Sequence, residues 1–252
     1  MKWIRRGAAH AGGMGERFAM RYNKTIRAVF QSRPNRFIAK VFVDGVLETV
    51  HVKNTGRCKE LLVPGATVIL DVSDNPARKT KYDLIAVYKE GLGLVNMDSQ
   101  APNRVVGEWL RESGHFPELT FVKPEYTYGA SRVDFYFEYA GKRALMEVKG
   151  CTLEREGIGY FPDAPTERGV KHLNELAAAV GAGYEAYLAF VIQMPGVEVV
   201  LPNVETHKEF GEALSRAVAA GVKVLCLQCE MEEDEMRIVG CKEKDAAGMD
   251  GE

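Results

Sequence analysis

Residues 132–149 impose the strongest constraint on the fold, because they alternate in polarity on both sides of a two-residue turn signal, Ala140-Gly141. Two strands joined by such a turn form an antiparallel hairpin, and strand side chains alternate between its two faces. With this turn, one face carries only apolar side chains, and a shift of one residue would mix the two sets. The apolar face is predicted to hold Val133, Phe135, Phe137, Ala144, Met146 and Val148.

The second face of this hairpin is predicted to bring two carboxylates together. In the same register Asp134 lies opposite Glu147, and Arg132 lies opposite Lys149. Directly opposed side chains have Cβ atoms about 5 Å apart, so two acids there repel unless positive charge lies between them. Either a divalent cation or the flanking Arg132 and Lys149 can supply that charge. Mg²⁺ is bound by one or two carboxylates together with water and phosphate oxygens, which favours a metal site over a charged outer face.

A basic cluster follows downstream, at the start of a predicted helix over 167–180. Thr166 is suited to be its N-cap, and Arg168, Lys171 and His172 recur at the spacing of one helix face. Positive charge in a first turn is unfavourable to the helix dipole, so these residues are better explained by a nearby phosphate or carboxylate than by solvent alone.

The rest of the chain divides into two predicted domains. Residues 20–93 contain about five short strands with turn signals between them, typical of a small β-barrel. Residues 94–240 follow the order helix, three strands, helix, strand, helix, strand, typical of an α/β domain. Residues 1–19 are predicted to be a flexible leader, and residues 241–252 an acidic tail.

Charge and cysteine content bear on partners and location. The net charge is −2, but residues 1–60 hold 13 Lys and Arg against 4 Asp and Glu. This asymmetry suggests a polyanion such as nucleic acid, and an ordinary solvated surface explains it equally well. No apolar run is long enough to span a bilayer, so no membrane partner is expected. Five scattered cysteines and the lack of a signal peptide predict a cytoplasmic protein. The oligomeric state cannot be predicted.

Five sequence blocks resemble the sugar fermentation stimulation protein A family: HVKNTGR at 51–57, LVPG at 62–65, SRVDF at 131–135, MEVK at 146–149 and GYFPDAPTERGVKHL at 159–173. The resemblance implies an N-terminal OB-fold-like barrel and a C-terminal PD-(D/E)XK nuclease-like domain, a two-domain α+β/α/β chain. It implies catalytic Asp134, Glu147 and Lys149, with Mg²⁺ or Mn²⁺ held by the two acids, the Val148 carbonyl and Glu108 of the first predicted helix. The residues that it implies for nucleic-acid or phosphate binding are Asp163, Arg168, Lys171, Asn54, Thr55 and Arg57, and the charge pattern described above adds Arg132 and His172.

Two functions remain open from the sequence. One is a Mg²⁺-dependent nuclease acting on DNA, or on RNA. The other is a non-catalytic DNA-binding regulator of sugar-utilisation genes, the description that the family resemblance brings. DNA binding is common to both, and the intact acid–acid–lysine set favours the first.

Overall fold

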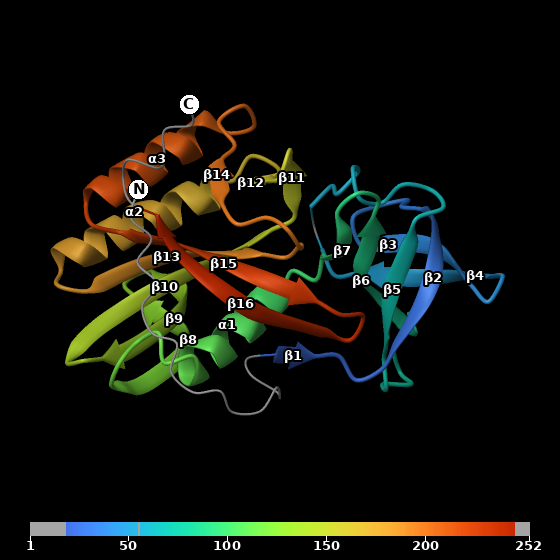
Figure 1. Cartoon of the computed structure of the whole chain (residues 1–252), viewed down its shortest axis with the longest axis horizontal. Coiled ribbons are helices and arrows are strands. Elements are labelled where there is room, and N and C mark those ends of the chain that lie inside the picture. The colour runs from blue at the N-terminus through green and yellow to red at the C-terminus, as the bar shows by residue number, and fades with distance from the viewer. Residues whose placement is uncertain (1–18, 55, 245–252) are drawn as a thin grey trace.

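The N-terminal part of the chain folds into a closed five-stranded barrel, at the right in Figure 1. The computed structural model describes residues 19–54 and 56–244. The strand order is β4-β3-β2-β5-β6, and a short parallel pairing of His51 with Asp83 and of Val52 with Leu84 joins β4 to β6 and closes the barrel. Strand β7 (Gly93–Asn96) extends the sheet beyond β6. The barrel strands are β2 (Thr25–Ser32), β3 (Ile38–Val43), β4 (Val46–Val52), β5 (Thr67–Val72) and β6 (Tyr82–Lys89).

The second domain is built on a seven-stranded mixed sheet with the order β1-β16-β15-β13-β10-β9-β8. Strands β8, β9 and β10 form an antiparallel meander, and β10, β13 and β15 run parallel. These strands are β1 (Ala19–Arg21), β8 (Leu119–Tyr128), β9 (Ser131–Tyr139), β10 (Lys142–Cys151), β13 (Glu185–Ile192), β15 (Lys223–Met231) and β16 (Glu235–Lys244). A small second sheet contains β11 (Leu153–Arg155), β12 (Ile158–Phe161) and β14 (Val200–Pro202).

Three helices cover this sheet from both sides. Helices α2 (Glu167–Gly181) and α3 (Lys208–Ala219) lie together on one face, and α1 (Ala101–Glu112) lies on the other (Figure 1). The core follows this division, because successive residues of β13 point to opposite sides: Leu188 packs in the cluster that contains α2 and α3, and Ala189 in the cluster that contains α1. In the described part of the chain, no helix is both long and apolar enough to cross a membrane.

The two domains share one packed junction. Ile69 and Ile85 of the barrel belong to the same buried cluster as Val105 of α1. Beside it, the Tyr22 hydroxyl donates to Asp98 at 3.2 Å, and Lys53 pairs with the fully buried Asp98 at 2.9 Å. The charge and the hydrogen bonds of the buried Asp98 are satisfied only while Tyr22 and Lys53 keep these positions. The network therefore helps to fix the barrel relative to α1.

The predicted barrel, the α/β order of the second domain and all three predicted helices are confirmed. Strand β1 begins at Ala19, the last residue of the predicted leader, and β16 continues to Lys244, four residues into the predicted acidic tail. The remaining residues of those two segments, 1–18 and 245–252, lie outside the described part of the chain. Strand β16 itself was not predicted.

The hairpin register is confirmed from Lys142–Tyr139 to Met146–Phe135. The face assignment was wrong for Val133, which packs in the cluster on the α2 side, together with Leu145. Val133 lies beyond the last β9–β10 pair, Met146–Phe135, and is paired there only with Tyr126 of β8.

Candidate functional site

The site begins where β9 and β10 separate. Beyond the pair Met146–Phe135 no backbone pairing joins the two strands, so the predicted backbone opposition of Asp134 to Glu147 and of Arg132 to Lys149 was wrong. Instead, the Asp134 carboxylate takes the place of a backbone acceptor: its Oδ2 accepts the N–H of Val148 at 2.8 Å. Where the two strands separate, the Asp134 carboxylate lies beside β10, and the Val148 N–H still has a hydrogen-bond acceptor.

Helix α1 supplies the second partner of Asp134. The Asn103 Nδ2 donates to Asp134 Oδ1 at 2.8 Å, so both carboxylate oxygens of Asp134 accept a hydrogen bond. The sequence analysis missed Asn103 and chose Glu108 from this helix. Five positions correspond to a rotation of about 140° around a helix. Within the described residues, no hydrogen bond or ion pair joins Glu108 to Asp134 or Glu147, and the pKa of Glu108 is raised by burial, with Arg104 of its own helix opposing that effect.

Glu147 is 2% exposed, and its two oxygens differ sharply. Oε1 accepts hydrogen bonds from Lys149 Nζ, at 2.5 Å, and from His172 Nδ1. Oε2 is buried and has no hydrogen-bond partner in the described structure. Burial alone would raise the pKa of Glu147, but the His172 hydrogen bond and the Lys149 charge outweigh it and hold that pKa below its usual range.

His172 and Arg168 of α2 continue this chain of contacts. Arg168 Nε donates to His172 Nε2 at 3.3 Å. Because a guanidinium can only donate, Nε2 is the acceptor, and the ring proton is on Nδ1, where it is donated to Glu147. Thr166 positions both residues, since its hydroxyl caps α2 by accepting the Gly169 N–H at 3.0 Å. The basic side chains at the start of α2 are therefore explained in part by the buried carboxylate of Glu147.

The two acids act on each other although their backbones are unpaired. Burial first, and repulsion by Glu147 second, raise the pKa of Asp134. The raised pKa of Asp134 and the unpartnered Oε2 of Glu147 show that the protein's own groups do not fully compensate this pair. Among the described residues no group of three or more His, Cys, Asp or Glu side chains forms a candidate metal site, so any cation here has at most two side-chain carboxylates.

The other predicted residues lie at varying distance from this centre. Lys171 is exposed and pairs with Glu175 at 3.6 Å, and Arg132 is exposed and lies 3.4 Å from Glu125. In the part of the chain that the structure describes, neither forms a hydrogen bond or an ion pair with Glu147. The Asn54 side chain already has a partner within the protein, because its Nδ2 donates to the Met97 carbonyl at 2.8 Å. Thr55 lies outside the described residues.

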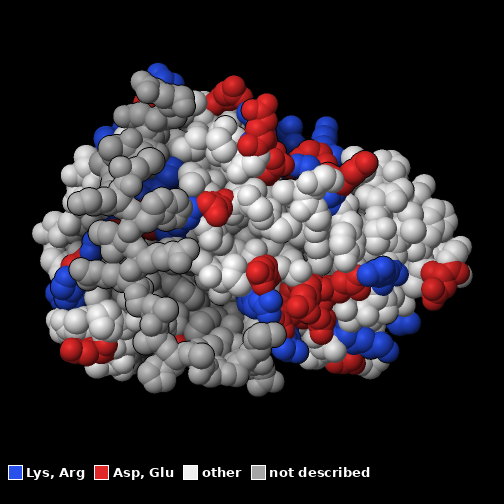
Figure 2. Space-filling model, viewed as in Figure 1, with Lys and Arg blue, Asp and Glu red and all other residues white. Residues whose placement is uncertain are grey.

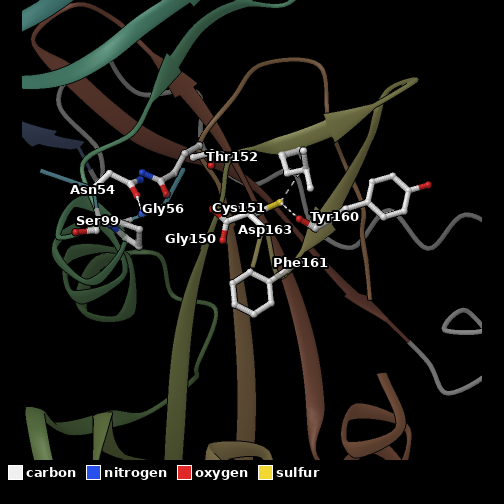
Figure 3. A pocket seen from close by; sticks show the side chains of 12 residues that line it. Asn54, Gly56, Ser99, Gly150, Cys151, Thr152, Tyr160, Phe161 and Asp163 are labelled. Atoms are coloured by element: carbon white, nitrogen blue, oxygen red, sulfur yellow. Dashed lines mark hydrogen bonds between the residues drawn. The ribbon is translucent and has the colours of Figure 1, made fainter. Parts of the chain in front are cut away.

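A cavity of about 160 Å³ lies between the two domains and is lined by residues of both (Figure 3). We call it the interdomain cavity. It adjoins the site on two sides, because Gly150 follows Lys149 and Pro102 precedes Asn103. In Figure 3, Asn54, Gly56 and Ser99 lie on one side and Tyr160 on the other. Its lining comprises Asn54, Gly56, Ser99, Pro102, Gly150, Cys151, Thr152, Leu153, Tyr160, Phe161, Asp163 and Gln193.

Asp163 lines this cavity and lies close to Gly56 of the barrel loop. Burial raises its pKa, with backbone N–H groups, its own and that of Ala164, opposing the shift. A Cβ at Gly56 would lie 2.5 Å from Asp163 Oδ2, so the barrel loop approaches the carboxylate as closely as only glycine allows. Asp163 therefore belongs to the cavity, while Arg168 and His172 belong to the Glu147 centre.

A basic loop cluster lies on the barrel side of the same region. We use this name for Arg36, Arg57 and Lys59, which with Arg33 line a shallow hollow that also includes Gly56. Arg33 holds the loop together, because its guanidinium donates to the carbonyls of Arg57 and Asn54. Within the described residues the three members of the cluster form no ion pair. They are therefore free to meet an external anion.

Among the described residues of the N-terminal third, two further arginines are paired with acids of the second domain. Arg21 pairs with Glu235 at 2.6 Å, and Arg27 with Glu233 at 2.5 Å. Figure 2 shows acidic and basic side chains next to each other at the junction of the two domains. The positive balance of residues 1–60 thus overstates the charge available to a ligand.

Comparisons with known proteins agree with this architecture. The family model of the SfsA N-terminal OB domain matches residues 32–97, and that of the sugar fermentation stimulation protein RE domain matches residues 100–235. The chain belongs to the sugar fermentation stimulation protein family. A homolog from Desulfitobacterium hafniense strain Y51 is 58% identical over 215 residues, which cover 85% of this chain and 93% of the homolog. A homolog from Clostridium beijerinckii is 53% identical over 219 residues, covering 87% and 96%.

A solved structure has the same fold. The structure of Pyrococcus furiosus SfsA in complex with Ca²⁺ matches with a TM-score of 0.81 and 24% identity, covering 90% of this chain and 98% of that one. The recognition of the family from five short sequence blocks, and the OB-fold barrel that it implied, are both confirmed.

Proposed function

We propose that this protein binds DNA and hydrolyses phosphodiester bonds in it, with a divalent cation at Asp134 and Glu147. One observation carries the proposal: Glu147 Oε2 is buried without a partner, next to a second carboxylate whose pKa is raised. A native protein leaves few such atoms unsatisfied, and a bound cation satisfies this one.

The residues present fit Mg²⁺ or Mn²⁺. Two carboxylates suffice for Mg²⁺, which keeps several waters and takes further oxygens from phosphate. The Val148 carbonyl is proposed as a third protein ligand. A bound cation would supply Lewis-acid polarisation of the phosphate and a more acidic water. The P. furiosus SfsA structure is a complex with Ca²⁺, which supports a divalent-cation site in this chain as well.

The chain's own residues have separate tasks in this proposal. Lys149, held at Glu147 Oε1, is near enough to stabilise negative charge on the phosphate or to orient a water. His172 and Arg168 are positioning residues, because they hold Glu147 by its Oε1 and leave Oε2 free. The basic loop cluster binds neighbouring phosphates.

A non-catalytic DNA-binding regulator is the second candidate, and one observation favours it. Three of the four carboxylate oxygens are satisfied by protein donors: both oxygens of Asp134, and Oε1 of Glu147. Such a site is largely stable without a cation. In that case Asp134, Glu147 and Lys149 only stabilise the fold where β9 and β10 separate, and the basic loop cluster alone binds DNA.

Incubation with labelled substrates separates the two candidates. We expect purified protein to cut single- or double-stranded DNA, or RNA, with Mg²⁺ or Mn²⁺ and not with EDTA. Asp134→Asn should abolish cleavage, whereas Asp44→Asn, the same change in an exposed barrel turn, should not. Binding without cleavage under all these conditions would support the regulator.

Metal binding has its own readout. Millimolar Mg²⁺ or Mn²⁺ should raise the melting temperature of the wild type, because a ligand that binds only the folded state stabilises it. Asp134→Asn and Glu147→Gln should remove this increase, and Asp44→Asn should keep it. A wild-type melting temperature that does not respond to either metal would contradict the assignment of a cation site.

A further inference from the structure

The lining of the interdomain cavity includes the side-chain amide of Gln193. Gln193 is 2% exposed, and its Nε2 donates to Asn96 Oδ1 and to the Asp98 carbonyl, both at 3.1 Å. These two bonds fix the amide orientation, so Oε1 points toward Gly150, where a Cβ would lie 2.2 Å away. Among the described residues no donor is hydrogen-bonded to Oε1. A carbonyl that lines a cavity and has no protein donor is open to water or to a ligand that supplies an N–H.

The rest of the lining is also rich in acceptors. The Asp163 carboxylate also lines the cavity; it accepts backbone N–H groups, its own and that of Ala164, and in the described structure it forms no ion pair with Lys, Arg or His. Ser99 and Thr152 add hydroxyl groups. A ligand that fits this lining presents N–H donors rather than acceptors.

Position and size restrict the ligand further. Two lining residues, Gly150 and Pro102, are the chain neighbours of Lys149 and Asn103, so an occupant of the cavity would lie near a phosphate bound at the acid pair. Its volume of about 160 Å³ is close to that of an engineered cavity of about 150 Å³ that holds one benzene molecule. There is room for one planar ring system and not for a base pair.

We infer that the interdomain cavity takes up one unpaired nucleobase of the bound strand and favours bases that carry an exocyclic amino group. The inference rests on the proposed function and specifies its substrate class: single strands, or duplexes with unpaired ends. The amino groups of adenine, cytosine and guanine lie on the Watson–Crick edge, which is available only when the base is unpaired. Thymine has a single N–H donor on that edge, at N3, whereas an amino group has two and can donate to Gln193 Oε1 and to Asp163 together.

Binding by fluorescence anisotropy, in EDTA so that no strand is cut, tests the inference. The probes are labelled oligo(dC), oligo(dT) and a blunt mixed-sequence duplex of equal length. We expect wild type to bind oligo(dC) about fivefold more tightly than oligo(dT), the equivalent of one hydrogen bond. Asp163→Asn places an N–H₂ donor opposite the amino group and should remove or reverse this preference. Asp44→Asn should retain it.

A second variant fills the cavity while the acids remain intact. Ser99→Phe should weaken binding of oligo(dC) and leave the blunt duplex unaffected, whereas Ser215→Phe, on the exposed face of α3, should change neither. Equal affinity of wild type for oligo(dC) and oligo(dT), with normal duplex binding, would overturn the base pocket and leave DNA binding in place. Absence of binding to all three probes would overturn both proposals.

Discussion

At the scale of single residues, the two oxygens of Glu147 have separate surroundings. Oε1 holds Lys149 and His172, while Oε2 has no partner in the described structure. Because both donors converge on one oxygen, the carboxylate is held in one orientation with its free lone pairs directed away from them. A side chain arranged in this way can hold a cation and keep a lysine beside it.

Lys149→Ala tests the role of that lysine. In a nuclease the cleavage rate should fall by about two to four orders of magnitude, the usual effect of losing a proton-transfer or charge-stabilising group. The metal-dependent rise in melting temperature should remain, because Asp134 and Glu147 are unchanged. Lys208→Ala, at an exposed position of α3, is the matched control. A variant that cleaves at the wild-type rate would exclude Lys149 from catalysis.

The hairpin pattern predicted Asp134, Glu147 and Lys149 as neighbours, and the structure places all three where β9 and β10 separate. It could not identify Asn103, because a helix pattern read from sequence does not tell which polar residue faces a distant strand. Gln193 left a visible signal, a polar residue at the end of the apolar run of β13. Its importance depends on Gly150 and Asn96, which only the folded chain brings together.

At the scale of elements, α2 shows how a cap serves the site. Thr166 accepts the Gly169 N–H, and the first turns of α2 carry Arg168 and His172 toward Glu147. Thr166→Ala should lower the free energy of unfolding by about 1 kcal/mol, the usual cost of a lost N-cap. Thr166→Ser keeps the hydroxyl and should lose much less. Denaturant unfolding of the three proteins measures the difference, and equal stability of the alanine variant would show that the cap contributes nothing.

The stability of the barrel is expected to depend on pH through Asp83, which pairs with His51 where β4 meets β6. Burial opposes ionisation of Asp83, but hydrogen bonds from Arg78 and His51 outweigh it and lower the pKa of Asp83. A lowered folded-state pKa adds stability above the unfolded value of about 3.9, and that stability is lost as the pH falls through the folded value. Asp83→Asn should therefore flatten the fall in unfolding free energy below about pH 4. Denaturant titrations over an acidic pH series measure it, and an unchanged slope would contradict this account.

Long elements were predictable and short ones were not. Helices of 12 to 15 residues show a clear apolar period, whereas β1, β11 and β14 have three residues each, too few for any alternation. Strand β16 is long, but its charged composition suggested a tail. It is a strand because β15 supplies a complete backbone partner on one side and β1 pairs at its other edge.

At the scale of the whole molecule, the charge asymmetry of the sequence is partly internal. Cations of the N-terminal third pair with acids near the turn between β15 and β16, as Arg21 does with Glu235. The basic loop cluster remains, on the same side of the barrel as the interdomain cavity, since Gly56 lines both hollows. Electrostatic attraction of DNA should thus be local, directed at the cavity and the acid pair.

Salt dependence measures that attraction. Each phosphate neutralised by Lys or Arg contributes about 0.9 to the slope of log K against log salt for duplex DNA. The double variant Arg36→Gln/Lys59→Gln should therefore weaken duplex binding at low salt for all sequences and reduce the slope by about two. Lys208→Gln/Arg216→Gln, with the same charge change on α3, should leave the slope unaltered. Arg33 is not suitable for this test, because its guanidinium holds the loop through backbone carbonyls. If the two double variants lower the slope equally, binding follows net charge, and the basic loop cluster has no special part in it.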